Sequence, residues 1–571
     1  MADLSVRFFS DGAETRSLVK YSGSGFTARI EGAQTVGLAL FSESTRVYEN
    51  AFRGDTVVFP SLEAGVYGFV ISADGKVAMH DRVVYYAEKY PLITPPRGII
   101  YHIFVDRFAR GGEVPVREDA VVNGDWYGGV PQYAEYPGMD VENNMFFGGT
   151  LYGVAEKLDY LGSLGCEWLY LSPVFTAYSN HKYDTADFMS VDPMFGGDAA
   201  LIHLINECHS RGIKLILDGV FNHVGDRSVY FDRYGQYGGA YVNENSPYRE
   251  WFDIRPDGSY DCWWGLTNLP KIRKVRSYRD YICKQVIPRY MRMGVDGWRL
   301  DVVDEYSNDF LEEITASAKS IDPEAVIIGE VWEDVTDKVA YNERKKYFCG
   351  AWLDSAMNYP VRGAILDYFA HHDASPLKAV IETQIAHYPR RSLLCLMNML
   401  GTHDTERVLT VLGGQSSEGK SGSELAKQRL APEERAHAVK LLKAAFWLLF
   451  CLPGVPAVYY GDEAGMEGGR DPFNRLPFPW GREERGLVET VRAAARLRRE
   501  HECLVRGDAE VAQCNDGFIV IKRRLGEKCV VCVCNMSYSY DYKVDPRFVP
   551  LNGAPHILYP GETGVYEEDA K

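Results

Sequence analysis

The sequence has no long uninterrupted hydrophobic segment. Its longest apolar run lies near Ala444–Leu452 and ends at Pro453, so it is too short to cross a bilayer, which takes about 20 residues. Residues Met1–Arg16 have neither the basic start nor the apolar core of a secretory signal. We therefore expect no contact with a membrane and a cytoplasmic protein.

A complete zinc-binding set of cysteines is also missing. The one cluster among the 12 Cys, formed by Cys529, Cys532 and Cys534, has no second Cys pair or His pair to complete a zinc site. If this segment is a strand, Cys532 and Cys534 share a face and Cys529 points away. We expect buried, reduced thiols, as in a cytosolic protein, and no metal.

Basic residues are outnumbered by acidic ones. The 62 Lys and Arg against 79 Asp and Glu give a net charge of −17, which argues against nucleic acid and favours a neutral or cationic partner. Aromatic residues, at 13%, are plentiful enough for stacking on sugar rings, although large aromatic-rich cores explain them equally well. A chain of 571 residues is too long for one hydrophobic core, so we expect about two to four domains.

Both ends of the chain have the pattern of small β-domains. Residues 1–92 contain short β-type runs broken by Gly, Ser and Asp, which predicts an N-terminal β-sandwich similar to a carbohydrate-binding module. These runs are Thr35–Phe41, Thr56–Phe59 and Val66–Ile71. Residues 503–571 return to this pattern, notably at Phe518–Lys522, and predict a C-terminal β-sandwich.

Between them, residues 93–502 alternate apolar strand-like runs with helical stretches. Eight such units predict the α/β class and a (β/α)8 TIM barrel. The predicted strands include Ile99–Val105, Glu167–Leu171, Lys214–Leu217, Val295–Leu300, Ala325–Gly329, Ala351–Leu353, Leu393–Leu400 and Ala457–Tyr460; the helices include Leu151–Leu164, Ala199–Arg211 and Pro432–Leu452. Residues 224–272 follow strand three without helical periodicity, which predicts an inserted, functional domain.

Three of the predicted strands lead into a carboxylate. Asp301 stands in GWRLDVVDE, Glu330 in IGEVW and Asp404 in LGTHDTER. The carboxyl ends of parallel barrel strands meet at one mouth, so these acids are expected to converge there. One ionised and one protonated carboxyl group are what is needed to break an acetal. The sequence therefore predicts a glycoside hydrolase.

The neighbours of these acids fit different roles. Arg299 lies two residues before Asp301 on the same strand, and a nearby cation lowers the pKa of a carboxylate, as suits a nucleophile. Trp332 follows Glu330 and gives it an apolar setting that suits a proton donor. His403, before Asp404, suits binding of sugar hydroxyls.

Each acid alone has a plainer interpretation, as a solvated loop carboxylate or a cap. Thr402 and Asp404, for example, are placed to cap the helix that follows strand seven. The recurrence of polar residues at five strand ends argues for a common site. Two further ends carry Asp218, Asn222 and His223 (DGVFNH), and His181, Tyr183 and Asp184 (SNHKYD).

With these motifs in this order, the chain resembles the alpha-amylase superfamily of glycoside hydrolases over most of residues 98–500. The segments FFGGTLYGVAEKLDYLGSLGCEWLYLSPVF and PGVPAVYYGDEAGMEGGRDPFNR extend the resemblance. It implies Asp301 as nucleophile, Glu330 as general acid/base and Asp404 as transition-state stabiliser. It also implies a set of sugar-binding residues: His181, Tyr183, Asp218, His223, Arg299, His403, Asp471 and Arg475. Arg475 and Asp471 either pair structurally or together clamp a hydroxyl.

Within the superfamily the chain is most similar to the cyclomaltodextrinase, neopullulanase and maltogenic amylase group. The resemblance rests on the N-terminal sandwich, on Asn268–Ile272 (NLPKI) and on YDCWWG, in which Trp263 and Trp264 either stack on glucose or pack the insertion onto the barrel. It implies cleavage of α-1,4 bonds in cyclodextrins, pullulan and malto-oligosaccharides, with α-1,6 bonds as a second target and transglycosylation as a side reaction. It further implies a homodimer formed through the N-terminal domain.

Two alternatives stay open: an exo-acting α-glucosidase or oligo-1,6-glucosidase, and a catalytically dead amylase-fold binding subunit. Such a subunit would be expected to lose the nucleophile or the acid.

The sequence departs from the family at its calcium site. Thr150 stands where the family has Asp after FFGG, and Ala109–Val121 replaces an Asn- and Asp-rich segment. Both would supply oxygen ligands to calcium, so we expect no calcium there and no other cofactor. Val303–Glu305 replaces a Lys-His pair of endo-acting amylases, which favours short or cyclic oligosaccharides.

Overall fold

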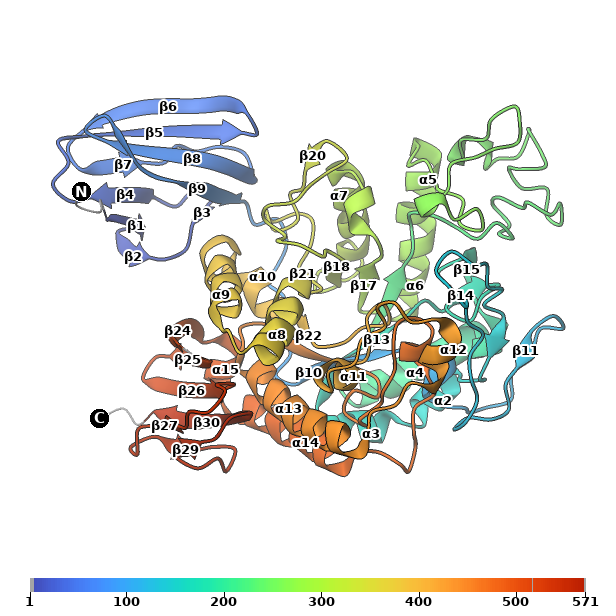
Figure 1. Cartoon of the computed structure of the whole chain (residues 1–571). Helices are drawn as coiled ribbons and strands as arrows, with labels where there is room; N and C mark the ends of the chain where they lie inside the picture. The colour runs from blue at the N-terminus through green and yellow to red at the C-terminus, as the bar shows by residue number, and fades with distance from the viewer. Residues whose placement is uncertain (1–4, 516, 569–571) are drawn as a thin grey trace.

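A barrel of eight parallel strands forms the centre of the computed structural model, which describes residues 5–515 and 517–568 (Figure 1). Each strand pairs with its neighbours in the order β21-β18-β17-β16-β13-β10-β23-β22, and a parallel bridge between Met357 and Met397 joins the two ends. The TIM barrel prediction is confirmed. In chain order the strands are β10 (Ile99–Ile103), β13 (Cys166–Leu171), β16 (Lys214–Gly219), β17 (Gly297–Leu300), β18 (Val326–Gly329), β21 (Ser355–Ala356), β22 (Met397–Met399) and β23 (Val455–Tyr459).

The barrel strands are buried on both faces, as expected for a parallel sheet covered by helices. Every residue of β10, β17, β18 and β23 is buried. Alternate side chains, among them Trp168, Ile216 and Ile328, form one cluster, and the others, such as Leu169, Leu217 and Ile327, pack with the surrounding helices. The main helices are α4 (Gly197–Ser210), α6 (Ile287–Met293), α7 (Asn308–Lys319), α8 (Tyr359–His371), α9 (Ser375–His387), α13 (Pro432–Cys451) and α14 (Arg485–Glu500).

Three of the predicted elements are wrong in part. The run 151–164 forms two helices, α2 (Leu151–Ala155) and α3 (Leu158–Leu164), because the backbone leaves helical geometry at Lys157. The run 393–400 begins inside helix α10 (Arg390–Cys395), and only Met397–Met399 is a strand. Residues 351–353 are buried but form no strand, and strand six starts at Ser355. Short apolar runs do not distinguish buried helix from buried strand.

The N-terminal region contains two sheets. One has the order β2-β1-β4-β7 and the other β3-β9-β8-β5-β6, and the rings of Phe8, Phe26, Phe59 and Phe69 pack together in their shared core. The predicted N-terminal sheet domain is confirmed, and the boundary at 92 stays a prediction. The strands are β1 (Val6–Ser10), β2 (Ala13–Thr15), β3 (Val19–Tyr21), β4 (Phe26–Ile30), β5 (Thr35–Ser42), β6 (Thr45–Arg53), β7 (Thr56–Val58), β8 (Gly65–Ala73) and β9 (Lys76–Tyr86).

The C-terminal region forms a five-stranded sheet, β24-β25-β26-β30-β28, beside a two-stranded one, β27-β29. On β26, Cys532 and Cys534 pack into the main core, whereas Cys529 joins the separate cluster between the two sheets, as the alternation predicted. The boundary at 502 stays a prediction. The strands are β24 (Asp508–Asn515), β25 (Phe518–Leu525), β26 (Lys528–Asn535), β27 (Tyr542–Lys543), β28 (Val549–Pro550), β29 (Ile557–Leu558) and β30 (Glu562–Glu568).

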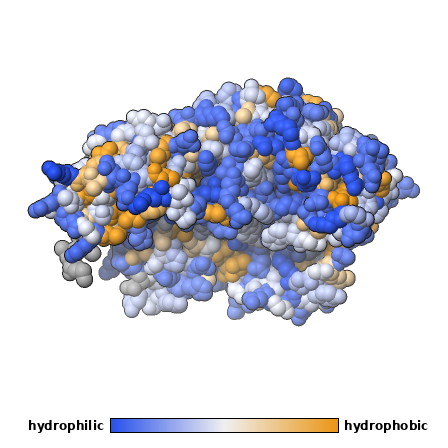
Figure 2. All heavy atoms as spheres, turned by 90° about the horizontal axis from the view of Figure 1, so that it is seen from above, coloured by the Kyte–Doolittle hydropathy of each residue, from blue (hydrophilic) through white to orange (hydrophobic). Residues whose placement is uncertain are grey.

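The insertion after strand three lies on the opposite side of the barrel from the two terminal sheet regions (Figure 1). Within residues 224–272 the structure has only two short 3-10 turns, η2 (Arg249–Trp251) and η3 (Trp263–Gly265), and isolated bridges such as Ile254 to Tyr260. Its bounds as a separate domain stay a prediction. No helix in the described residues is both long and apolar enough for a membrane span. Hydrophobic residues form separate patches on the largely hydrophilic face of Figure 2.

Candidate active site

Asp301 and Glu330 lie side by side at the carboxyl end of the barrel. Asp301 follows β17 directly and Glu330 follows β18. The sheet hydrogen bonding continues through both residues, because Asp301 N donates to Gly219 O at 3.1 Å and Glu330 N donates to Leu300 O at 3.1 Å. The parallel register therefore fixes both acids at the same mouth, and both are buried.

Arg299 connects these two acids to a third. Its Nη1 donates to Asp301 Oδ1 at 2.7 Å and to Asp218 Oδ1 at 2.9 Å, and its Nη2 forms an ion pair with Glu330 Oε2 at 2.9 Å. The guanidinium group is fully buried. The two acids occupy different nitrogens of one planar group, which keeps them next to each other and facing the same opening.

One cation does not neutralise three carboxylates, so ionisation of the whole group is opposed. Burial raises the pKa of Asp301 well above its ordinary value; Arg299 opposes this rise, and the charges of Glu330 and Asp218 add to it. Arg299 does lower the pKa of Asp301, as expected, but burial outweighs it, so the expectation of a lowered pKa overall is wrong. The group holds a proton more tightly than separate aspartates do, and this proton belongs to the coupled set.

Glu330 is held on both of its oxygens. The Nε1 of Trp332 donates to Oε1 at 3.0 Å, and the backbone N–H of Val302 donates to Oε2 at 2.8 Å. Trp332 stacks on Tyr359 with ring centres 3.7 Å apart and remains 47% exposed. Its open face beside the acid makes it a candidate sugar-contacting residue that the sequence reasoning treated only as an apolar neighbour. Trp332 is two residues after Glu330, and in an extended chain this spacing puts both side chains on the same side. That spacing was the signal in the sequence.

Asp404 lies at the open part of the same site. Its Oδ2 is 3.1 Å from His403 Nε2, and its Oδ1 is 3.5 Å from Arg475 Nη2. The side chain is 31% exposed, so the surrounding protein removes only part of its water. That desolvation, with the nearby charge of Glu330, raises the pKa of Asp404 to about 7. The interpretation of Asp404 as a helix cap is wrong, because the next helix, α11 (Val408–Leu412), starts after Arg407.

Tyr183 connects the second and third strand ends to the seventh. Its hydroxyl donates to Asp218 Oδ2 at 2.9 Å and lies 2.6 Å from His403 Nε2, and its ring is nearly parallel to that of His403, at 5.0 Å. His181 Nδ1 accepts from Tyr183 N at 3.1 Å. Burial lowers the pKa of both His181 and His403 well below its usual range. Both imidazoles are therefore neutral at pH 7 and able to exchange hydrogen bonds with sugar hydroxyls.

Arg475 forms the structural pair with Asp471 that was one of the two interpretations of these residues, and its role in binding a hydroxyl stays a prediction. Its Nη1 pairs with Asp471 at 3.0 Å, its Nε donates to His403 O at 2.8 Å, and its Nη2 faces Asp404. Asp471 is half-exposed at the rim. The arginine thus fixes the loop that carries His403 and Asp404 and also keeps one nitrogen directed at the site.

His223 and the two tryptophans form a stack that leads from the barrel mouth to solvent. His223 lies 5.1 Å from Trp263, which lies 5.2 Å from Trp264. His223 is buried, with its pKa lowered to about 3 by burial and by the nearby Lys274, and neither ring nitrogen has a partner among the described residues. Trp263 packs the insertion onto the barrel, whereas Trp264 is 82% exposed and free to stack on a sugar. The packing interpretation thus holds for Trp263, and stacking of Trp264 on a sugar stays a prediction.

A cavity of about 520 Å³ lies beside these residues, which is the size of a small-molecule site. Its lining includes Lys271, Lys274, Glu305, Tyr306 and Tyr341.

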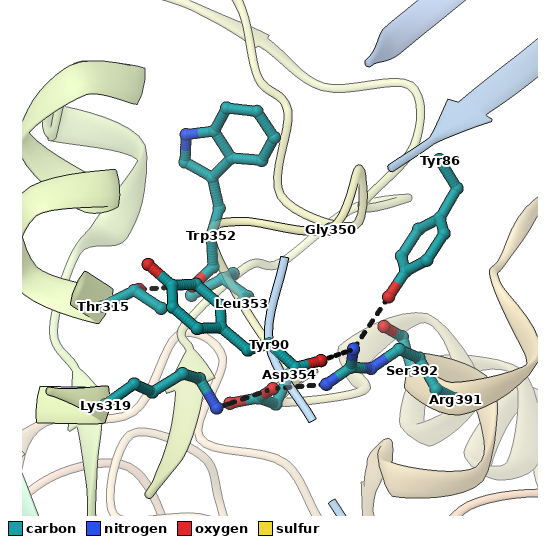
Figure 3. A pocket seen from close by; sticks show the side chains of 10 residues that line it. All are labelled: Tyr86, Tyr90, Thr315, Lys319, Gly350, Trp352, Leu353, Asp354, Arg391 and Ser392. Atoms are coloured by element: carbon teal, nitrogen blue, oxygen red, sulfur yellow. Dashed lines mark hydrogen bonds and ion pairs between the residues drawn. The ribbon is translucent and has the colours of Figure 1, made fainter. Parts of the chain in front are cut away.

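Figure 3 shows a second, much smaller cavity, of about 10 Å³, with room for about one water. There Asp354 sits between Lys319 and Arg391, where strands β18 and β21 begin. It is at the end of the barrel that usually serves stability.

The residues at the family's calcium position do not fit a metal. Thr150 Oγ1 donates to Gly111 O at 2.5 Å and accepts from Gly153 N at 3.0 Å, so it caps helix α2. The guanidinium group of Arg110 donates hydrogen bonds to the backbone oxygens of Phe147 and Asn123, at 2.8 and 3.0 Å. A cation of the chain itself thus binds carbonyl groups of the kind that calcium would use.

Comparison with known proteins agrees with this arrangement. Residues 102–496 match the model of the family described as "Alpha amylase, catalytic domain". The chain is 36% identical over 484 residues to an amylopullulanase of Thermoanaerobacter thermohydrosulfuricus, covering 75% of this chain and 31% of that protein. The chain thus spans about a third of the length of this much longer relative.

Two further relatives are closer in length. A cyclomaltodextrinase of Geobacillus thermopakistaniensis is 31% identical, over 82% of this chain and 77% of its own. The solved structure of a cyclic alpha-maltosyl-(1→6)-maltose hydrolase from Arthrobacter globiformis superposes with a TM-score of 0.67 and 29% identity, over 83% of this chain and 99% of its own.

Proposed function

Because this chain belongs to the alpha-amylase family of glycoside hydrolases, we propose that it hydrolyses α-glucosidic bonds in short or cyclic glucans with retention of configuration. The observation that carries this proposal is the pairing of Asp301 and Glu330 on one guanidinium group at the barrel mouth. Two carboxyl groups held next to each other suit a double displacement, in which one attacks and the other moves the proton. The proposed substrates are cyclodextrins, pullulan and malto-oligosaccharides, cleaved at α-1,4 bonds and also at α-1,6 bonds.

The proposed mechanism has two steps. Asp301 attacks the anomeric carbon while Glu330 protonates the departing glycosidic oxygen, and a covalent glycosyl-enzyme forms. Glu330 then removes a proton from water, which attacks the same carbon and releases Asp301. Asp404, with His403, binds ring hydroxyls while positive charge develops on the sugar. A sugar hydroxyl that enters instead of water gives transglycosylation.

The proposal also needs the other predicted site residues. Tyr183 and His181 would bound the cleaved sugar on one side and Arg475 with Asp471 on the other. The exposed face of Trp264 would stack on a glucose unit of the incoming chain. These roles are supported by the contacts around Asp218 and His403, which bring three strand ends into one network.

Product analysis on γ-cyclodextrin, pullulan, maltotriose and isomaltose tests the proposed specificity. We expect the cyclodextrin ring to be opened and pullulan to be cut to short oligosaccharides. Release of glucose alone, with intact rings, would favour the exo-acting α-glucosidase or oligo-1,6-glucosidase. A lack of turnover on all four would favour the binding subunit, although this chain keeps all three acids. A homodimer through the N-terminal sheets and a cytoplasmic location remain predictions.

A further inference from the structure

Val302, the residue after the proposed nucleophile, has a strained backbone. Its φ of 46° and ψ of 46° lie in the left-handed region, where a branched Cβ crowds the following peptide. Among the non-glycine residues with positive φ in the described ranges, Val302 is the one with a β-branched side chain. A conformation of this kind persists only where the surroundings impose it.

The contacts on both sides of Val302 impose this conformation. Before it, Asp301 N is bonded to Gly219 O at 3.1 Å, on the neighbouring barrel strand. After it, the side chain of Val303 is fully buried, and Glu305 N donates to Val302 O at 3.0 Å to form the turn η5 (Val303–Glu305). The peptide between Asp301 and Val302 therefore has one orientation.

In that orientation the peptide N–H points at the proposed acid/base. It donates to Glu330 Oε2 at 2.8 Å, and the Nη2 of Arg299 lies 2.9 Å from the same oxygen. Oε1 faces one donor, Trp332 Nε1, at 3.0 Å. A proton on Oε2 would point at groups that carry protons themselves, whereas Oε1 keeps a free position on the side of Trp332, which is partly open to solvent.

We propose that Val302 is a positioning residue for proton transfer, and this inference rests on the proposed function. Its N–H and Arg299 hold Oε2 of Glu330, so that Oε1 is the atom that exchanges the proton. In the first step Oε1–H gives its proton to the glycosidic oxygen as the C1–O bond breaks and the bond from Asp301 forms. In the second step Oε1 takes a proton from water as the water oxygen bonds to C1 and the bond to Asp301 breaks. Glu330 needs no rotation between the two steps.

A backbone ester tests this assignment in the full-length protein. Replacement of Val302 by 2-hydroxyisovalerate exchanges the N–H for an oxygen and keeps the side chain. The matched control is the same exchange at Val303, whose N–H, at the start of η5, donates to no acceptor in the described part of the chain. The substrates are maltotriose, whose leaving group needs a proton, and 4-nitrophenyl α-maltoside, whose leaving group does not.

We expect the ester at Val302 to lower kcat/KM for maltotriose about tenfold, as for the loss of one hydrogen bond to a charged group, with the nitrophenyl substrate almost unaffected. Equal losses for the two esters, or on the two substrates, would overturn the assignment. A natural protein inactive on both substrates would instead refute the proposed function.

A second variant needs no unnatural residue. Val302→Gly keeps the N–H and the backbone contacts on both sides, and glycine adopts the left-handed conformation without the steric cost that valine has. We therefore expect kcat for maltotriose close to that of the natural protein, with a raised thermal midpoint. His372→Gly is the matched control, because His372 has a φ of 59° at the end of α8, far along the chain from the acids. A Val302→Gly protein as impaired on maltotriose as the ester would contradict the proposal, because the side chain and not the N–H would then be the group that matters.

Discussion

Glu463, in the loop after β23, offers a quantitative test of the electrostatics of this fold. The side chain is fully buried; its Oε1 accepts hydrogen bonds from Tyr101 at 2.6 Å and Tyr160 at 2.9 Å, and its Oε2 accepts from Gly461 N at 3.0 Å. No cation is bonded to it in the described structure. Burial raises the pKa of Glu463 from 4.5 to about 7.

The direction in which stability changes with pH follows from which state, folded or unfolded, binds the proton of Glu463 more tightly. The folded state keeps the proton of Glu463 up to about pH 7, whereas the unfolded chain loses it near pH 4.5. The favourable contribution is therefore complete below pH 4.5 and is lost as the pH rises towards 7. The difference of about 2.5 pH units corresponds to about 3 kcal/mol of unfolding free energy.

Glu463→Gln removes this dependence, because its amide stays neutral. The NH2 group takes the place of Oε1, so Tyr101 and Tyr160 change from donors to acceptors, while the carbonyl accepts from Gly461 N. This rearrangement costs the same at every pH, so we expect urea unfolding to show that the stability of the variant relative to the natural protein rises by about 3 kcal/mol between pH 4.5 and pH 8. Glu244→Gln, at an exposed position, is the control and should change nothing. Parallel stability curves for Glu463→Gln and the natural protein would refute the reasoning.

Three further predictions concern the site and the region of the family's calcium position. Because the pKa of Asp404 is raised to about 7 and that of Asp301 is also raised, the acid limb of kcat/KM should lie nearer pH 7 than the pH of about 4 expected for an ordinary aspartate. A limb at pH 4 would show that these carboxyl groups do not hold a proton in the free enzyme. Trp264→Ala should raise KM for γ-cyclodextrin about tenfold with kcat unchanged, whereas Tyr237→Ala, at another exposed aromatic residue of the insertion, should not, and an unchanged KM would exclude stacking. EDTA should leave the thermal midpoint unchanged while Arg110→Met lowers it; a midpoint that depends on calcium would contradict the role given to Arg110.

The barrel was predictable because its strands are buried on both faces and therefore read as continuous apolar runs. The same property caused the errors at 351–353 and 393–400, where buried residues belong to a loop and to α10. A short apolar run does not by itself distinguish a buried strand from a buried helix or loop, because the difference lies in its contacts with neighbouring strands.

The meeting of Asp301 and Glu330 was predictable in the same way, since the ends of parallel strands converge. The proton affinity of Asp301 was not, because it depends on the register of β16 with β17. That register pairs Asp218 with Arg299 and so places a further carboxylate on the cation. The residues next to Asp301 in the sequence include Arg299 but not Asp218, so the sequence indicated the cation and not the second carboxylate. The contact of Val302 with Glu330 was not predictable either, because it depends on a backbone conformation that valine rarely adopts.

Covalent trapping tests the central proposal most directly. A 5-fluoro-α-glucosyl fluoride should form a glycosyl-enzyme that accumulates, because the fluorine slows its hydrolysis more than its formation. We expect mass spectrometry of the digested protein to find one added sugar, bonded to Asp301. A label on another residue, or turnover that gives the β-anomer first by proton NMR, would contradict the account.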